Sequence, residues 1–218
     1  MESKINVSVR VKPLNDKESL MEKNHMWSVV SDTTLMNKRT KEVYTFDNVF
    51  GPDISTQEIF ESTCKEIVRA AMDGINQTVF AYGQTSSGKT YTMKGYQNDG
   101  LIPLAVQELF SQIQQRPTKK FEVTVQYIEI YNESVNDLID PANKNLEIRE
   151  SITQGIYINR LSDNKVETMN DVLFFMAKGD EARAIAATKL NELSSRSHTV
   201  FRINIKSFDE TANKCKYS

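Results

Sequence analysis

Apolar and polar residues alternate from Ile5 to Val11, with isoleucine or valine at every second position. A period of two is typical of a half-buried strand, and Pro13 would end it. A second short strand is predicted from Glu42 to Phe50, because Gly51 and Pro52 follow as a turn signal. The N-terminal part of the chain therefore predicts strands rather than helices.

The apolar spacing becomes helical after this turn. Ser55 and Glu58 form a capping box, in which the hydroxyl caps an amide three residues on and the carboxylate reaches back. The predicted helix ends near Gly74, since glycine is suited to a helix C-terminus. Its apolar face comprises Ile59, Phe60, Ile67, Val68 and Ala71. A second helix is predicted to begin near Pro103, with Val106, Leu109, Phe110 and Ile113 on one face.

The rest of the chain predicts elements of both kinds. They are a strand from Phe121 to Tyr131, a short helix from Asn132 to Asp140, strands at Leu146–Arg149 and Gly155–Asn159, a helix that a Thr168–Asp171 capping box opens toward Ala184, and a last strand through Phe201, Ile203 and Ile205. The tail after Phe208 is polar and predicts no closing element.

A further strand is predicted from Val79 to Tyr82, four apolar or aromatic residues between the first helix and a glycine-rich loop. The order strand, helix, strand, loop, helix favours an α/β fold. The sequence contains no repeats, low-complexity tracts or linker-like runs, so we expect one domain over residues 1–218.

Composition narrows the class of protein. The chain has 218 residues, 39% hydrophobic and 26% charged, which is ordinary for a globular domain. A net charge of −2 argues against a nucleic-acid partner, and two small basic groups, Lys38-Arg39-Lys41 and Lys119-Lys120, read as solvated surface. No apolar run approaches the ~20 residues that span a bilayer, and the N-terminus has no signal-peptide core. We therefore expect a cytoplasmic protein without a membrane partner.

The chain has too few cysteines and histidines to predict a disulfide framework, a zinc site or a cysteine–histidine catalytic pair. Cys64 and Cys215 predict free thiols in a reducing compartment. With only His25 and His198, a zinc site or a cysteine–histidine catalytic pair is not expected.

The glycine-rich loop carries the strongest chemical signal. Gly83-Gln84-Thr85-Ser86-Ser87-Gly88-Lys89-Thr90 matches G-x-x-x-x-G-K-[ST] at every fixed position, between a predicted strand and a helix. Such glycines let backbone N–H groups approach phosphate closely, while the lysine faces the β- and γ-phosphates and the threonine hydroxyl faces Mg²⁺. The loop predicts binding of a nucleoside triphosphate with Mg²⁺. No Asn-Lys pair is followed two places on by Asp, as in the guanine-specific N-K-x-D motif, so ATP is favoured over GTP.

Several motifs together resemble the motor domain of a kinesin. They are FAYGQTSSGKTYTM around the phosphate loop, SSRSH within Asn191–His198, YIEIYNESVNDLID, FDNVFGP, and Arg10-Val11-Lys12-Pro13, which is similar to an R-x-R-P adenine-site motif. Lys12 departs from the family's arginine, keeping the charge but losing the planar fork. The similarity runs from about residue 4 to about residue 207. TYTMKG and LIPLAVQELF look most like the centromere-associated kinesins.

The resemblance implies a role for each matching residue. Arg10 and Pro13 would line one side of the adenine, with Tyr91 against the other. Asn191 to His198 would be switch I, which senses the γ-phosphate because its contacts exist only while that group is present. Ser194 would approach Mg²⁺ together with Thr90, and Ser195 the γ-phosphate and the lytic water; Arg196 would pair with a switch II glutamate. From the residues alone, SSRSH could instead be a polar loop before a strand.

The family's third nucleotide motif is not found in this sequence. Switch II has the form D-x-x-G, and no aspartate here has glycine three places on. Switch II, the microtubule-facing helices and the neck linker are therefore expected to be absent, which makes the chain roughly the first two-thirds of a motor domain. We expect no ATPase activity from it alone, because the family positions the lytic water and holds Mg²⁺ through switch II. Val79 to Tyr82 would also lack both neighbouring strands.

The partner implied by the resemblance is the microtubule, which a complete family member moves along while hydrolysing ATP. Only Lys144 to Arg149 is expected to offer residual contact in this chain. Two alternatives stay open: a non-catalytic nucleotide-binding pseudo-motor with an interaction role, and another P-loop ATPase or nucleotide kinase. The latter would need a Walker B aspartate or lid arginines, which the sequence does not place, and SSRSH argues against it.

Overall fold

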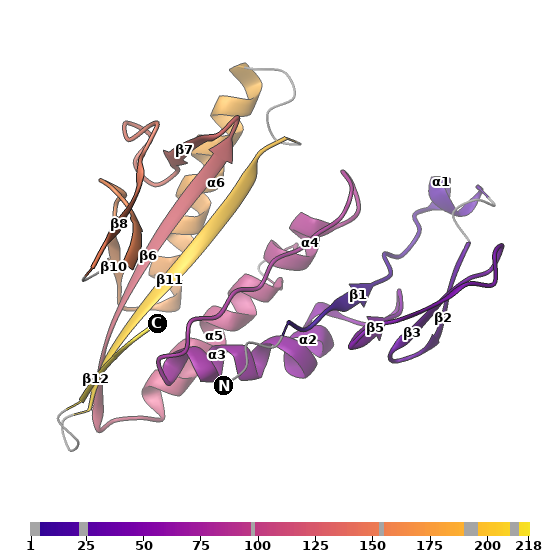
Figure 1. Ribbon diagram of the computed structural model, residues 1–218, viewed down its shortest axis with the longest axis horizontal. Coiled ribbons are helices and arrows are strands. Elements are labelled where there is room, and N and C mark those ends of the chain that lie inside the picture. The colour runs from indigo at the N-terminus through magenta and orange to yellow at the C-terminus, as the bar shows by residue number, and fades with distance from the viewer. Residues whose placement is uncertain (1–4, 22–25, 97–98, 153–154, 190–195, 210–213) are drawn as a thin grey trace. The chain divides into compact units, whose positions relative to one another are not determined.

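The computed structural model describes residues 5–21, 26–96, 99–152, 155–189, 196–209 and 214–218. They form two compact units, which are described separately (Figure 1). Unit 1 comprises residues 1–63 and 81–101, and unit 2 comprises residues 64–80 and 102–218. In the described part of the chain, no helix is both long and apolar enough to cross a bilayer.

Unit 1 contains two small sheets. Strand β1 (Ser8–Arg10) pairs in parallel with β5 (Asn48–Phe50), and strands β2 (Trp27–Ser31), β3 (Thr34–Asn37) and β4 (Val43–Thr45) form an antiparallel meander. The predicted N-terminal strand is confirmed, although it is shorter than the apolar alternation. The predicted strand from Glu42 to Phe50 is two strands, β4 and β5, each pairing with a different neighbour. Unit 1 also holds the short helix α1 (Asp16–Ser19), which was not predicted.

The first predicted helix is confirmed. Ser55 caps α2 (Thr56–Ile59) by accepting from the Glu58 amide, and the Glu58 carboxylate accepts from the Ser55 amide. The Ser55 hydroxyl and the Ser55 amide both donate to the Glu58 carboxylate, which lowers the pKa of Glu58 below its ordinary value. The helix continues through a π-helical turn, η2 (Phe60–Cys64), into α3 (Lys65–Met72), and Gly74 follows with φ +87°. The π turn was not predicted; within it, the Thr63 hydroxyl donates to the Ile59 carbonyl at 2.6 Å.

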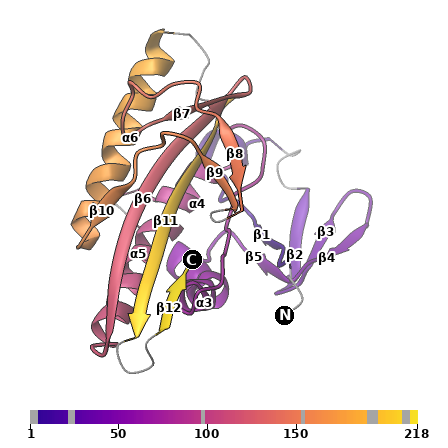
Figure 2. The same ribbon diagram turned by 60° about the vertical axis from the view of Figure 1, so that its left-hand side comes forward.

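Unit 2 is built on two long antiparallel strands, β6 (Lys119–Tyr131) and β11 (His198–Asp209), which lie side by side in Figures 1 and 2. β12 (Lys214–Tyr217) pairs with the outer edge of β11, whereas β7 (Ser134–Asp137) and β10 (Asn164–Val166) pair with the other edge of β6. A separate hairpin joins β8 (Ile148–Ser151) to β9 (Gly155–Ile158). The strands predicted near β6, β8, β9 and β11 are therefore confirmed, with shifted bounds.

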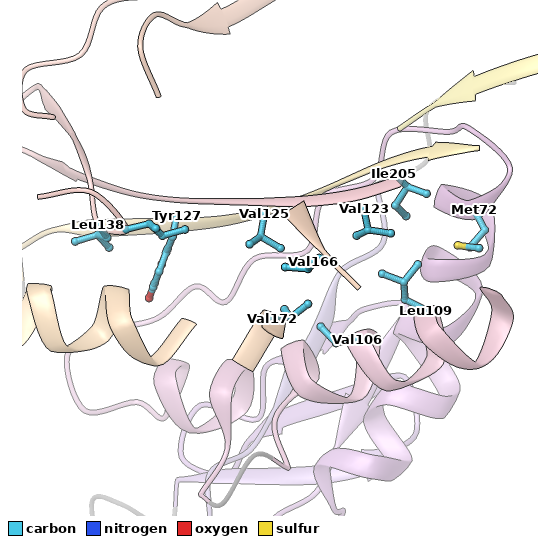
Figure 3. Packing of buried hydrophobic residues seen from close by; sticks show 11 residues of the cluster. Met72, Val106, Leu109, Val123, Val125, Tyr127, Leu138, Val166, Val172 and Ile205 are labelled. Carbon is cyan, nitrogen blue, oxygen red and sulfur yellow. The ribbon is translucent and has the colours of Figure 1, made fainter. Parts of the chain in front are cut away.

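Helices α3, α5 (Leu101–Gln114) and α6 (Met169–Lys189) bury one face of this sheet (Figure 3). Odd-numbered residues of β6 share that face, because side chains alternate along a strand. The buried cluster comprises Met72, Val106, Leu109, Val123, Val125, Tyr127, Leu138, Ile139, Val166, Val172 and Ile205. The helices predicted near Pro103 and from Thr168 are thus confirmed, and α6 extends to Lys189 rather than ending near Ala184.

Three expectations are wrong. Asn132 and Glu133 have positive φ (46° and 62°) and form a tight hairpin turn into β7, so Asn132 to Asp140 is not a helix. The tail does contain a strand, β12, because it pairs with β11. Val79 to Tyr82 is not in a strand: no described strand pairs with it, and Phe80 and Tyr82 are 78% and 96% exposed.

Candidate nucleotide-binding site

The glycine-rich loop of unit 1 is a tight turn held by left-handed residues. Ser86 has φ +66° and Gly88 has φ +98°, and Gly88 is the N-cap of helix α4 (Lys89–Lys94). The Ser87 amide donates to the Gln84 carbonyl at 3.2 Å, and the Thr92 amide donates to the Gly88 carbonyl at 2.9 Å. Gly88 is required here because side chains rarely adopt this φ.

Gly83 is required for a different reason. A Cβ atom built at this position would clash with the Ser87 hydroxyl and would come within 3.2 Å of its Cβ atom. The backbone of the first motif glycine therefore lies so close to Ser87 that any other residue here would force the Ser87 side chain to shift. Both fixed glycines of the motif thus have a structural reason in this chain.

Lys89 turns back into the loop that precedes it. Its ammonium group donates to the carbonyl oxygens of Gly83 at 2.7 Å and Gln84 at 2.9 Å. The side chain thus holds a cation against the backbone of the loop that the motif assigns to the phosphates. The charge is already in position, and an incoming phosphate would replace neutral carbonyl acceptors by anionic ones.

Arg10 and Tyr91, both assigned to the adenine site, come together in unit 1. The guanidinium carbon of Arg10 lies 5.2 Å from the centroid of the Tyr91 ring. Its Nη1 atom donates to the hydroxyls of Thr56 and Thr92, each at 3.1 Å. Thr56 is only 6% exposed, so one of these acceptors is fixed in the core of the unit. Sequence reasoning missed both threonines, and no pattern along the chain indicates them.

The other adenine-site residues behave differently. Pro13 is exposed, and Lys12, the departure from the family's arginine, donates to Glu18 at 2.7 Å. This hydrogen bond and that from the Asn15 amide lower the pKa of the Glu18 carboxyl below its ordinary value. Lys12 therefore ties the chain after β1 to helix α1.

The predicted switch I falls only partly on described residues. Asn191, Ser194 and Ser195 lie outside them, whereas Arg196 is exposed and Ser197 accepts from Arg183 of α6 at 2.9 Å. These residues belong to unit 2, so they are described apart from the loop. His198 begins β11 opposite Ile130.

The predicted metal position rests on hydroxyl groups. Thr90 is exposed at the start of α4, which leaves its side chain accessible. Over the described ranges, no group of histidine, cysteine, aspartate or glutamate side chains is suited to a metal ion. A metal site made of protein side chains alone is therefore not indicated in these ranges. A threonine hydroxyl is suited to Mg²⁺ that is held mainly by phosphate oxygens and water.

Comparisons with known proteins agree with this geometry. The family model described as Kinesin motor domain matches residues 10–218. Kinesin-like protein KIN-7D, mitochondrial, of Arabidopsis thaliana is 43% identical over 205 residues, which cover 93% of this chain and 19% of that protein. Kinesin-like protein KIN-7G of Oryza sativa subsp. japonica is 43% identical over 202 residues, covering 92% of this chain and 22% of that protein. The chain thus spans about a fifth of the length of these curated relatives.

A solved structure has the same fold. It is described as "Structure of a fast kinesin: Implications for ATPase mechanism and interactions with microtubules". It matches with a TM-score of 0.91 and 34% sequence identity, over 98% of this chain and 62% of that one. The expected α/β fold with a mixed sheet and flanking helices is confirmed by this likeness.

Proposed function

Because the chain belongs to the kinesin motor-domain family, we propose that it is the ATP-binding part of a microtubule motor domain. The observation that carries this proposal is the Gly83–Thr90 loop, with the Lys89 ammonium bonded to the Gly83 and Gln84 carbonyls. Arg10 and Tyr91 in the same unit add an aromatic and cationic surface for a base. A triphosphate beside a stacking surface is the chemistry of a nucleotide.

Each group of residues would bind a different part of the nucleotide. The triphosphate would lie along Gly83, Gln84, Thr85, Ser86, Ser87, Gly88, Lys89 and Thr90, with the lysine at the β- and γ-phosphates. Thr90 and Ser194 would hold Mg²⁺, whose charge offsets that of the phosphate oxygens. Asn191 and Ser195 would lie near the γ-phosphate and the lytic water, and Arg196 would pair with a switch II glutamate.

The base would be recognised by stacking rather than by hydrogen bonds. Arg10, Pro13 and Tyr91 provide surface, and none of them matches a donor or acceptor that is peculiar to adenine. We therefore propose a modest preference for ATP over GTP, since discrimination is strong only where a site hydrogen-bonds one ligand and leaves its own groups unpaired with the other.

The partner would be the microtubule, and the location the microtubule cytoskeleton of the cytoplasm. The printed description of the solved fast kinesin speaks of microtubules for that protein. For this chain we propose weak contact only, because its match covers 62% of the solved kinesin chain. We also propose that it does not turn over ATP by itself. The likeness to centromere-associated kinesins stays a narrower proposal, which rests on TYTMKG and LIPLAVQELF; the relatives reported above are named KIN-7.

Equilibrium titration tests the proposed function. Fluorescently labelled ATP is added to the folded chain with Mg²⁺ and again with EDTA, and GTP is used as a competitor. We expect saturable binding that weakens without Mg²⁺ and that unlabelled ATP displaces better than GTP. Folded protein that shows no saturable binding would contradict the proposal.

A further inference from the structure

Two polar links join α6 to β6 in unit 2. The Tyr127 hydroxyl donates to the Asp180 carboxylate at 2.8 Å, and Arg183 Nε donates to the Glu129 carboxylate at 3.2 Å. Tyr127 and Glu129 are two apart on β6 and share one face, while Asp180 and Arg183 are three apart on the helix and are neighbours on its surface. The two links are therefore parallel and adjacent.

The Glu129–Arg183 link places a charged pair in a largely buried position. The Glu129 side chain is 5% exposed and that of Arg183 is 20% exposed. A buried carboxylate needs a partner that satisfies its charge. Glu129 thus holds the guanidinium in one orientation, and a planar guanidinium held at one edge has its other N–H groups fixed as well.

One of those groups points at Ser197, near the C-terminal end of the predicted switch I. Arg183 Nη2 donates to the Ser197 hydroxyl at 2.9 Å. Ser197 directly follows Arg196 and directly precedes His198, which is paired with Ile130 in the sheet. The chain at Ser197 is therefore held by a side-chain bond to the helix on one side and by strand pairing on the other.

We propose that Arg183 is a positioning residue for switch I: oriented by the buried Glu129, it anchors Ser197, which belongs to the predicted switch I from Asn191 to His198. This inference rests on the proposed function, which places that segment at the γ-phosphate. The anchor itself lies entirely within unit 2.

The geometry explains why arginine is needed at this position. A lysine would keep the charge opposite Glu129, but its compact ammonium lacks the rigid fork that serves two acceptors in fixed directions. Arg183→Lys therefore keeps the ion pair and loses the hold on Ser197. Ser197→Ala removes the same bond from the other side and leaves the ion pair intact.

Trypsin cleavage after Arg196 measures this anchor in the full 218-residue chain. Cleavage of a folded protein requires local opening, and its rate follows the population of the open form. We expect Arg183→Lys and Ser197→Ala each to speed cleavage after Arg196 by about five- to tenfold, as loss of one charge-assisted hydrogen bond implies. The double variant should be no faster than the quicker single one, because both remove one bond.

Two controls separate anchoring from general loosening. Cleavage after Arg39, in the turn between β3 and β4 of unit 1, should not change in any variant. Asp180→Asn weakens the parallel link to Tyr127 without touching Ser197, so it should lower the unfolding temperature without a selective effect after Arg196. Unchanged cleavage in Arg183→Lys and Ser197→Ala, or an equal increase in Asp180→Asn, would overturn the proposal.

The same cleavage experiment with bound nucleotide tests this proposal separately from the proposed function on which it rests. With Mg²⁺ and a non-hydrolysable ATP analogue, we expect slower cleavage after Arg196 in the parent and less protection in Arg183→Lys. Protection should disappear in Lys89→Ala. If the analogue has no effect on the parent while Arg183→Lys still speeds cleavage, the anchor is supported and the proposed function is contradicted.

Discussion

The guanidinium carbon of Arg10 lies 5.2 Å from the centre of the Tyr91 ring, although the two residues are far apart in the chain. A planar base between them would need two stacking layers of about 3.5 Å each. Arg10 must therefore move outward from Tyr91 before a base can enter between them, and the hydroxyls of Thr56 and Thr92 hold it in its present place.

This relationship predicts unequal contributions to ATP affinity. Tyr91→Ala removes a stacking surface worth about 1–3 kcal/mol and should weaken ATP binding by about 5- to 150-fold. Tyr91→Phe keeps the ring and should bind within about twofold of the parent. Arg10→Ala should cost less than Tyr91→Ala, because the parent gives up its Arg10–Tyr91 contact on binding. Calorimetric titration of the three variants measures this order, and an alanine variant at position 91 with parental affinity would refute it.

Gly179 of α6 is predicted to reject alanine. Alanine normally stabilises a helix interior relative to glycine by about 0.5–1 kcal/mol. At this position, however, a Cβ atom would lie 2.8 Å from Cε1 of Tyr127 and 3.2 Å from Cβ of Leu138. Gly179→Ala should therefore destabilise the chain by about 1–3 kcal/mol through overpacking.

Urea unfolding of Gly179→Ala measures this cost. Ala177→Gly, two residues earlier on the exposed face of the same helix, is the matched control and should lose only the ordinary helix preference of about 0.5–1 kcal/mol. A Gly179→Ala variant more stable than the parent would show that the helix and Tyr127 do not pack as described.

Tyr127 predicts a dependence of stability on alkaline pH. Burial first, and then the Asp180 carboxylate, raise the pKa of its phenol far above the ordinary value. The neutral form is thus favoured in the folded state, and this contribution is fully present below the unfolded pKa of about 10. It is lost as the pH rises from there toward the folded pKa, since the unfolded chain releases the proton first.

Tyr127→Phe isolates that contribution. At neutral pH the variant should be less stable by about 1–3 kcal/mol, because Asp180 loses a buried hydrogen-bond donor. Above about pH 10 the difference between parent and variant should narrow, since only the parent has this tyrosine to ionise. Unfolding curves at pH 7 to 11 decide the matter, and a difference that grows with pH would contradict the assignment.

Microtubule binding is predicted to be weak. Within Lys144 to Arg149, the segment nominated for contact, the Arg149 guanidinium donates to Glu147 at 2.6 Å, so its charge is already paired. Co-sedimentation at low salt should show little binding, with a small further loss in Lys144→Ala. Tight, salt-sensitive co-sedimentation would show that the chain has a microtubule surface beyond this segment.

Local signals in the sequence explain which elements could be predicted. The Ser55–Glu58 and Thr168–Asp171 capping boxes lie within four residues and form as expected. The helix predicted from Asn132 is wrong because polar residues such as Asn132 and Glu133 can precede a helix or form a turn. Here both residues have positive φ and form a hairpin turn. β12 could not be anticipated, because its short sequence becomes a strand only by pairing with β11.

In the candidate site, too, contiguous residues could be predicted and contacts between distant residues could not. The loop motif predicted Lys89 and its glycines, since those residues are contiguous. The Arg10 hydrogen bonds to Thr56 and Thr92 span 46 and 82 positions, and no spacing rule connects residues so far apart. Arg183 was missed for this reason as well, because its bond to Glu129 spans 54 positions.

The central claim is that the Gly83–Thr90 loop binds the phosphates of ATP through Lys89. The most direct measurement compares Mg²⁺–ATP affinity in the parent, Lys89→Ala and Lys94→Ala, which remove the same charge from the first and the last residue of α4. Loss of a charge-assisted bond costs about 1.5–3 kcal/mol, so Lys89→Ala should bind about 10- to 150-fold more weakly. Lys94→Ala should stay within about threefold, because Lys94 is at the opposite end of α4 from the loop. Equal affinities in the parent and Lys89→Ala would contradict the account.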